Sequence, residues 1–148
     1  MDIKRYSENS VTVYIGDEIN EDTNKKLVHL KNELEKMEID GVSEIVISYT
    51  SLIIYYDIFK TTGKDVEGVL KKVDLAKLEK RSLKYNLVEI PVCYGGEYGP
   101  DLKLFEDNGL SPEEVIELHR DTEYLVYMLG FMPGFPYLGG LDERSFKG

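Results

Sequence analysis

Apolar residues recur along the first part of the chain at spacings that predict one long helix. Leu27, Leu30 and Leu34 are three and four positions apart, which places them on one face of a helix. The pattern begins at about Asn20 and stops at Asp40-Gly41, a sequence typical of a helix end. Lysine and glutamate residues occupy the positions between these leucines, so the opposite face of the helix is expected to be exposed to solvent.

Three strands and a second helix surround this element in the predicted order. The β-branched run at 11–15, the alternation at 43–49 and the apolar run at 52–56 each predict a strand. Thr62, with Asp65 three residues later, resembles a capping box and begins a helix that we expect to continue to about residue 81 or 82.

A fourth strand is predicted at 87–94, with Pro91 indicating a sheet edge or a bulge. The resulting order, βαββαβ, predicts an α+β fold whose residues 1–86 form a ferredoxin-like, split-βαβ domain. The last strand leads into a second domain at 87–148.

In residues 87–148 the sequence predicts only a few short helices and strands. Ser111, followed by Pro112 and with Glu114 three residues on, predicts a helix start. A short helix is expected at 101–107, and a strand at 123–129.

The loop predicted at 129–142 is dense in glycine, proline and large apolar side chains. Pro133 and Pro136 donate no backbone hydrogen bond, which excludes a regular helix or a central strand. The apolar side chains must pack on a core or line a pocket. Because 87–148 holds few strands, we expect this domain to be cut short or completed by another chain.

Composition narrows the classes of function. The chain has 148 residues and a net charge of −10, with the acidic excess after residue 87, which disfavours binding to nucleic acid or anionic membranes. Its start lacks a signal-peptide pattern, and no apolar run approaches the ~18 residues of a membrane span, so we expect a cytoplasmic protein. One cysteine and two histidines exclude a disulfide framework, a cysteine-based zinc cluster and a three-histidine site, and we predict no metal.

Few residues of the sequence are candidates for a catalytic or ligand-binding role. His119, near a helix end, either favours the helix dipole or serves as a general acid/base or substrate contact. Glu97 and Asp101 stand in a glycine-rich segment, as proton carriers or as solvated loop acids. Gly95-Gly96, with Gly99, either directs amides at an anion or forms a structural turn.

Three further residues or segments favour structural interpretations. Thr61-Thr62-Gly63-Lys64 lacks the first glycine of a phosphate-binding loop, since Ile58 stands there, and is interpreted as a helix cap. We expect Cys93 to be a small buried residue and His29 to lie on the surface.

Three ordered blocks of sequence closely resemble the family of 5-oxoprolinase B subunits, which includes the sporulation kinase A inhibitor and allophanate hydrolase subunit 1. The blocks are Ile90-Pro91-Val92-Cys93-Tyr94-Gly95-Gly96-Glu97-Tyr98-Gly99-Pro100-Asp101-Leu102, then Leu110-Ser111-Pro112-Glu113-Glu114-Val115-Ile116 with His119, then Tyr127-Met128-Leu129-Gly130-Phe131-Met132-Pro133-Gly134-Phe135-Pro136-Tyr137-Leu138-Gly139-Gly140-Leu141. The resemblance implies an N-terminal α/β domain followed by the first part of a cyclophilin-like β-barrel.

The resemblance also implies a function. Members serve as the B-type subunit, with a C-type subunit partner and a separate A-type subunit, in ATP-dependent opening of 5-oxoproline to glutamate. The alternatives are an inhibitor that binds a sporulation-type histidine kinase, and an allophanate hydrolase subunit. An enzyme subunit of this kind is expected to be inactive alone.

We expect a pocket shared with the C-type subunit, in which a lactam or its phosphorylated form is held. The candidates for proton transfer are His119, Glu97 and Asp101. The candidates for substrate binding are Gly95, Gly96, Met132, Pro133, Gly134, Phe135 and Tyr137. Peptide amides of the glycines could donate to a developing oxyanion.

Overall fold

The computed structural model describes residues 1–78 and 82–146, and the chain divides into two compact units. Unit 1 contains Met1–Lys84 together with Tyr127–Pro136. Unit 2 contains Tyr85–Val126 and Tyr137–Gly148. The predicted domain boundary between residues 86 and 87 stays a prediction.

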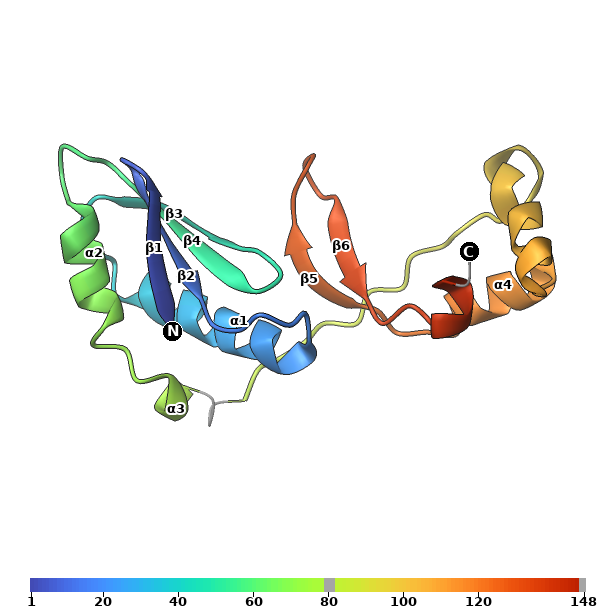
Figure 1. Cartoon of the computed structure of the whole chain (residues 1–148), viewed down its shortest axis with the longest axis horizontal. Helices are drawn as coiled ribbons and strands as arrows, with labels where there is room; N and C mark the ends of the chain where they lie inside the picture. Colours follow the sequence, from blue (N-terminus) through green and yellow to red (C-terminus); the bar gives the residue numbers. More distant parts are fainter. Residues whose placement is uncertain (79–81, 147–148) are drawn as a thin grey trace. The chain divides into compact units, whose positions relative to one another are not determined.

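Unit 1 is built on a four-stranded antiparallel sheet in the order β1-β2-β4-β3 (Figure 1). Its strands are β1 (Asp2–Ser7), β2 (Ser10–Tyr14), β3 (Val42–Ile47) and β4 (Ser51–Tyr56). In the central pair Val11 lies opposite Ile54 and Val13 opposite Leu52, so these four side chains share one face. All four are fully buried.

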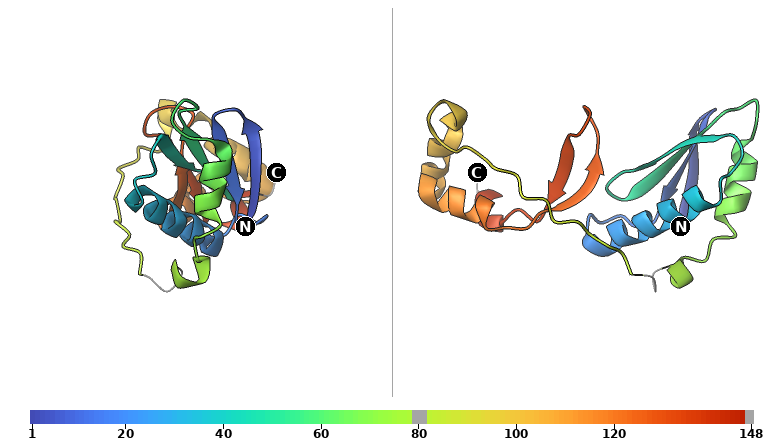
Figure 2. Two further views of the ribbon diagram at one scale, coloured as in Figure 1. Left: turned by 90° about the vertical axis from the view of Figure 1, so that its left-hand side faces the viewer. Right: turned by 180° about the vertical axis from the view of Figure 1, so that it is seen from behind.

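Helices α1 (Glu21–Lys36) and α2 (Gly63–Leu70) cover this apolar face (Figures 1 and 2). Leu27, Leu30 and Leu34 of α1 are at most 1% exposed, as their spacing predicts. Val66 and Leu70 of α2 complete the same core. Burial of each leucine contributes roughly 1.5–3 kcal/mol, so the sheet and helices stabilise each other.

The predicted βαββαβ order is wrong at both ends. β1 precedes the first predicted strand and occupies the sheet edge beside β2. Residues 87–94, predicted as the last strand, form no strand, and Leu87 and Ile90 are 71% and 70% exposed. A strand needs a pairing partner for its backbone groups, and this stretch has none in the described part of the chain.

The second predicted helix is also shorter than expected. α2 ends at Leu70, and α3 (Leu75–Leu78) begins after Asp74, whose side chain accepts a hydrogen bond from the amide of Lys77 at 3.3 Å. An aspartate that bonds a nearby amide in this way begins a new helix in place of continuing the old one. The predicted end at residue 81 lies outside the described residues.

Two sequence interpretations of single residues are corrected. His29 is only 7% exposed; α3 also packs on α1 and widens the covered part of that helix. Cys93 is exposed, because it lies in the extended segment that pairs with no strand among the described residues.

Unit 2 and the hairpin that follows hold short elements. They are η1 (Gly96–Tyr98), η2 (Pro100–Asn108), α4 (Pro112–Arg120), β5 (Leu125–Leu129), β6 (Pro136–Gly139) and η3 (Glu143–Phe146). β5 and β6 form a two-stranded sheet, and the described ranges contain no closed barrel. The start of β6 corrects the prediction that 129–142 is loop throughout; Pro136 is tolerated as the first residue of a strand.

Within 1–78 and 82–146, no helix combines the length and hydrophobicity needed to cross a membrane.

Candidate functional site

Helix α4 carries His119 one residue before its C-terminal end. The helix starts with a complete capping box, in which a serine and a glutamate bond each other's amides. The Ser111 hydroxyl accepts a hydrogen bond from the Glu114 amide at 3.2 Å, and the Ser111 amide donates to the Glu114 carboxylate at 2.8 Å. The bond from the Ser111 amide lowers the pKa of Glu114. At the other end, the Thr122 hydroxyl donates to the Leu118 carbonyl at 2.8 Å, so both ends of the element are fixed.

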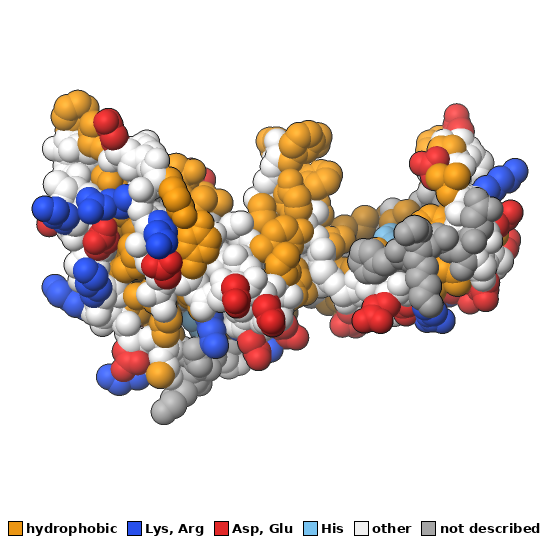
Figure 3. Space-filling model, viewed as in Figure 1, with side chains coloured by type: hydrophobic (Ala, Val, Ile, Leu, Met, Phe, Trp, Pro, Cys, Tyr) orange, Lys and Arg blue, Asp and Glu red, His pale blue; other side chains and the backbone are white. Residues whose placement is uncertain are grey.

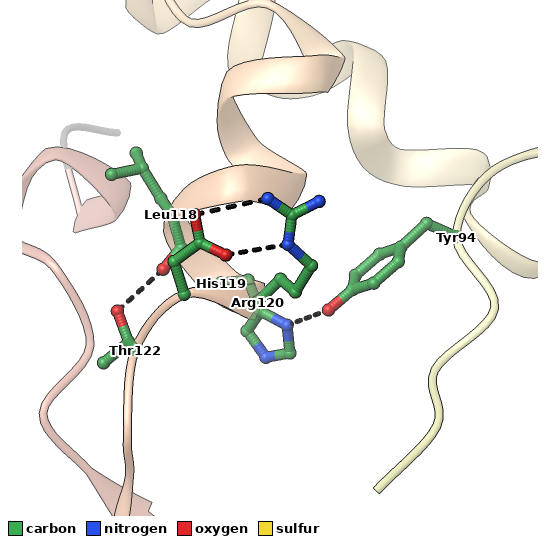
Figure 4. Close-up of polar contacts among 6 residues, drawn as sticks. Tyr94, Leu118, His119, Arg120 and Thr122 are labelled. Atoms are coloured by element: carbon green, nitrogen blue, oxygen red, sulfur yellow. Dashed lines mark hydrogen bonds and ion pairs between the residues drawn. The ribbon is translucent and has the colours of Figure 1, made fainter. Parts of the chain in front are cut away.

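His119 lies between two tyrosine side chains of unit 2. The hydroxyl of Tyr94 and Nδ1 of His119 share a hydrogen bond (Figure 4). The His119 ring lies 5.7 Å from the Tyr94 ring, edge-on at 78°, and 5.4 Å from the Tyr124 ring at 39°. All three side chains are half-buried. We call these three residues the histidine cluster.

The Tyr124 hydroxyl is the unusual polar group of the histidine cluster. It is buried and has no hydrogen-bond partner in the described part of the chain. A hydroxyl removed from water normally has a partner, because leaving it unpaired costs about 1–3 kcal/mol. The histidine cluster thus contains a polar atom that a ligand, a water molecule or further protein could satisfy.

The charged groups next to His119 neutralise each other. Arg120 Nε lies 2.7 Å from a carboxylate oxygen of Asp121. Their hydrogen bonds raise the pKa of Arg120 and lower the pKa of Asp121. Figure 4 shows this ion pair at the end of α4, beside the contact between Tyr94 and His119.

Neither tyrosine of the histidine cluster is among the site residues that the sequence predicts. Tyr94 directly precedes the predicted Gly95-Gly96 pair, and Tyr124 lies five positions after His119. A tyrosine beside a candidate loop or a candidate histidine is the signal that could have found them.

The predicted turn at Gly95–Asp101 is a tight turn of unit 2. Gly95 and Gly96 have φ of 84° and 56°, which side chains other than glycine rarely adopt. A Cβ on Gly99 would lie 2.7 Å from the Gly95 nitrogen, so the chain closes on itself there. Glu97 and Asp101 are exposed, and no hydrogen bond or ion pair joins either to His119 in the residues that the structure describes.

The other predicted site residues lie at the tip of the β5–β6 hairpin. Phe131 and Gly134 have φ of 66° and 76°, and the Gly130 amide donates to the Phe135 carbonyl at 3.1 Å across the turn. Met132, Pro133, Gly134 and Phe135 belong to unit 1, whereas Tyr137 and the Gly95–Asp101 turn belong to unit 2. The shared pocket therefore stays a prediction.

The hairpin tip, residues 129–135, exposes its apolar side chains (Figure 3). The exposed fractions are 59% for Leu129, 85% for Phe131, 53% for Met132 and 42% for Phe135. The rings of Phe131 and Phe135 meet edge to face at 5.9 Å, which holds the tip together without covering it.

An open cavity of about 720 Å³ lies elsewhere in unit 1 and contains none of the predicted site residues. Arg5, Tyr56 and Gly63 are among its lining residues. Arg5 is already paired with Glu67 at 2.9 Å, so the cavity offers no unpaired cation from this residue.

Comparison with known proteins identifies the family. The family model described as carboxyltransferase domain, subdomain C and D, matches residues 1–147. The chain belongs to this family. The resemblance to 5-oxoprolinase B subunits that the sequence blocks indicate is confirmed.

Two relatives of this chain are both named as the B subunit of 5-oxoprolinase. The B subunit of 5-oxoprolinase from Bacillus subtilis (strain 168) is 38% identical over 157 residues, which cover 96% of this chain and 64% of the relative. The B subunit of 5-oxoprolinase from Haemophilus influenzae (strain ATCC 51907 / DSM 11121 / KW20 / Rd) is 36% identical over 106 residues, covering 70% of this chain and 48% of the relative. The chain thus spans less than two thirds of either relative.

A solved structure supports the fold of the family. The crystal structure of TTHA0988 superposes with a TM-score of 0.77 at 30% identity, covering 93% of this chain and 27% of that chain.

Proposed function

We propose that this chain serves as part of the B-type subunit of an ATP-dependent 5-oxoprolinase, which opens 5-oxoproline to glutamate. The relatives named as B subunits of 5-oxoprolinase support this assignment. The observation that carries the chemistry is the histidine cluster, where Tyr94 holds His119. The Tyr124 hydroxyl of the same cluster has no hydrogen-bond partner among the described residues. A protein of this kind would work in the cytoplasm with a C-type subunit partner and a separate A-type subunit, and would be inactive alone.

Opening a lactam places negative charge on the carbonyl oxygen and requires a proton at the leaving nitrogen. His119 is the residue of the histidine cluster whose side chain can both accept and donate a proton. Peptide amides of Gly95 and Gly96, in the same unit as His119, would stabilise the oxygen. Glu97 and Asp101 are further proposed proton carriers.

ATP is proposed for the complex and not for a site on this chain. The turn Gly95–Asp101 contains Glu97 and Asp101, whose two exposed carboxylates would repel a polyphosphate. The turn contains no lysine or arginine. The residues of this turn do not suit nucleotide binding, so we assign no ATP-dependent step to this chain.

The test is reconstitution of the chain with its C-type and A-type partners, followed by measurement of ATP-dependent glutamate release from 5-oxoproline. We expect His119→Gln to lower kcat by roughly 10²–10⁴-fold, the range of general acid–base catalysis. His29→Gln, at the other histidine of the chain, is the control and should retain activity. Activity that survives His119→Gln would contradict the proposal.

A second function, inhibition of a sporulation-type histidine kinase, is favoured by the exposed hairpin tip. An apolar, aromatic surface of this kind is typical of a protein-binding site. In a kinase autophosphorylation assay, inhibition by the wild-type chain that is lost in Phe131→Ser would favour the inhibitor. Allophanate hydrolase activity is the remaining alternative and is tested by substituting allophanate in the reconstituted assay.

A further inference from the structure

We propose that Tyr94 is a positioning residue that fixes the tautomer of His119. In this arrangement the hydroxyl of Tyr94 donates a hydrogen bond to Nδ1, and Nε2 carries the N–H of the imidazole. The tautomer itself is independent of the proposed function, whereas its chemical consequence rests on that function.

Proton chemistry determines the direction of the hydrogen bond. A neutral imidazole has one nitrogen that donates and one that accepts. A tyrosine hydroxyl carries an O–H that can donate to the accepting nitrogen. If Nδ1 donated instead, the phenolic proton would need another acceptor. The structure gives the Tyr94 hydroxyl none among residues 1–78 and 82–146.

The surrounding rings hold the imidazole in this orientation. The Tyr94 ring lies 5.7 Å away on one side, and the Tyr124 ring lies 5.4 Å away. Figure 4 shows Nδ1 directed at the Tyr94 hydroxyl and the other ring nitrogen directed away from it. A ring flip would separate Nδ1 from its partner, so the orientation and the tautomer are coupled.

A carboxylate often orients a functional histidine through Nδ1, and here a tyrosine takes that place. Arg120 and Asp121 are paired with each other at 2.7 Å, and Glu97 and Asp101 are exposed. None of these carboxylates is hydrogen-bonded to His119 in the part of the chain that the structure describes. Tyr94 is therefore the side chain that sets which nitrogen carries the proton.

The consequence for a ligand is specific. With hydrogen on Nε2, neutral His119 presents a donor and not a base at that nitrogen. It would bind an acceptor oxygen of a carbonyl or carboxylate, the groups present on a lactam acid. Neutral His119 would then polarise the substrate by donating a hydrogen bond, and water activation would fall to another group.

The experiment uses the full chain labelled with ¹⁵N-histidine, without substrate or partner. Long-range ¹H–¹⁵N correlations, recorded where the imidazole is neutral, distinguish a nitrogen that carries hydrogen from one that does not. His119→Gln assigns the signals by their loss, and His29 remains as an internal reference. We expect His119 to show an unprotonated Nδ1 and a protonated Nε2.

Tyr94→Phe removes the hydroxyl and keeps the ring, and we expect the His119 signals to move toward an average of both tautomers. Tyr98→Phe is the matched control, because Tyr98 lies in the turn that follows Tyr94 and is 71% exposed. A protonated Nδ1 in the wild-type chain would overturn the proposal even if Tyr94→Phe failed to fold. Unchanged His119 signals in a folded Tyr94→Phe variant would overturn it as well. Loss of 5-oxoproline activity is a separate result, since the NMR experiment measures no reaction.

Discussion

Asn24 donates a hydrogen bond from its side-chain Nδ2 to the carbonyl oxygen of Tyr127 at 3.0 Å, across 103 positions of sequence. Asn24 lies in the first turn of α1 and is only 2% exposed. The Tyr127 ring also lies 5.8 Å from the ring of Tyr49, which follows β3. These two contacts explain why residues 127–136 form part of unit 1 although they are far away in sequence.

Replacement of Asn24 by alanine should loosen this attachment. The Tyr127 carbonyl would lose its buried donor, and an unpaired buried polar group costs about 1–3 kcal/mol. We expect that loss in the free energy of unfolding, measured by denaturant titration with tyrosine fluorescence, since the chain has 11 tyrosines and no tryptophan. Amides near Tyr127 should also exchange faster with solvent.

Asn32→Ala on the same helix is the control. Asn32 is exposed. Its replacement should therefore change the free energy of unfolding by at most about 0.5 kcal/mol, as is usual for surface substitutions. Equal effects of the two substitutions would show that Asn24 contributes only through helix propensity.

The parts of unit 1 that could be predicted are those with a local signal. Leu27 and Leu30 show the period of a helix. Asn20 accepts a hydrogen bond from the amide of Thr23 at 2.8 Å, as a helix cap does. β1 has no such signal: of its six residues only Ile3 is half-buried, because it is an edge strand held by backbone pairing. Pairing is a property of two segments and is invisible in either one alone.

The candidate site also divides into a local part and a part that depends on distant contacts. His119 is predictable because of its residue type and its position on a helix. Its partner Tyr94 lies 25 residues earlier in the chain. The β-branched composition around Tyr94 favours a strand. The contact depends on how the Gly95–Gly99 turn and α4 fold back, which no local pattern reports.

Two glycines of the chain should respond oppositely to alanine. At Gly99 a Cβ would lie 2.7 Å from the Gly95 backbone nitrogen, so Gly99→Ala must distort the turn beside Tyr94. At Gly68, inside α2, a Cβ meets no heavy atom at contact distance. Alanine there should stabilise the helix by roughly 0.5–1 kcal/mol.

Thermal unfolding and amide spectra measure both outcomes. Gly99→Ala should lower stability and shift the signals of residues 94–102, and Gly68→Ala should raise the midpoint of unfolding. A neutral Gly99→Ala variant with unshifted turn signals would contradict the close approach of Gly95 and Gly99.

The carboxylate of Asp142 should titrate well below its usual range. Its hydrogen bonds with Arg144, 2.9 Å from both the backbone amide and Nε, lower the pKa of Asp142 from 3.8 to about 2. A lowered folded-state pKa stabilises the folded chain above the unfolded value of 3.8, and this contribution is lost as pH falls through about 2.

Carboxyl NMR titration checks this value. Arg144→Gln should raise the pKa of Asp142 toward 3.8, whereas Arg120→Gln, which removes the partner of Asp121, should leave it unchanged. An ordinary titration midpoint for Asp142 in the wild-type chain would contradict the ion pair.

The capping box of α4 should be needed to hold the helix that carries His119. Ser111→Ala removes the oxygen that accepts from the Glu114 amide. Loss of such a cap costs about 0.5–2 kcal/mol, whereas Ser111→Asp retains an acceptor and should preserve most of the stability. Glu113→Gln changes an exposed residue outside the box and serves as the control.

Denaturant unfolding gives the stability, and equal stability of the alanine and aspartate variants would show that the box does not stabilise α4. The His119 imidazole signals report whether the helix end moves, and we expect them to broaden in Ser111→Ala alone, because fraying at the first turn removes a large part of so short a helix.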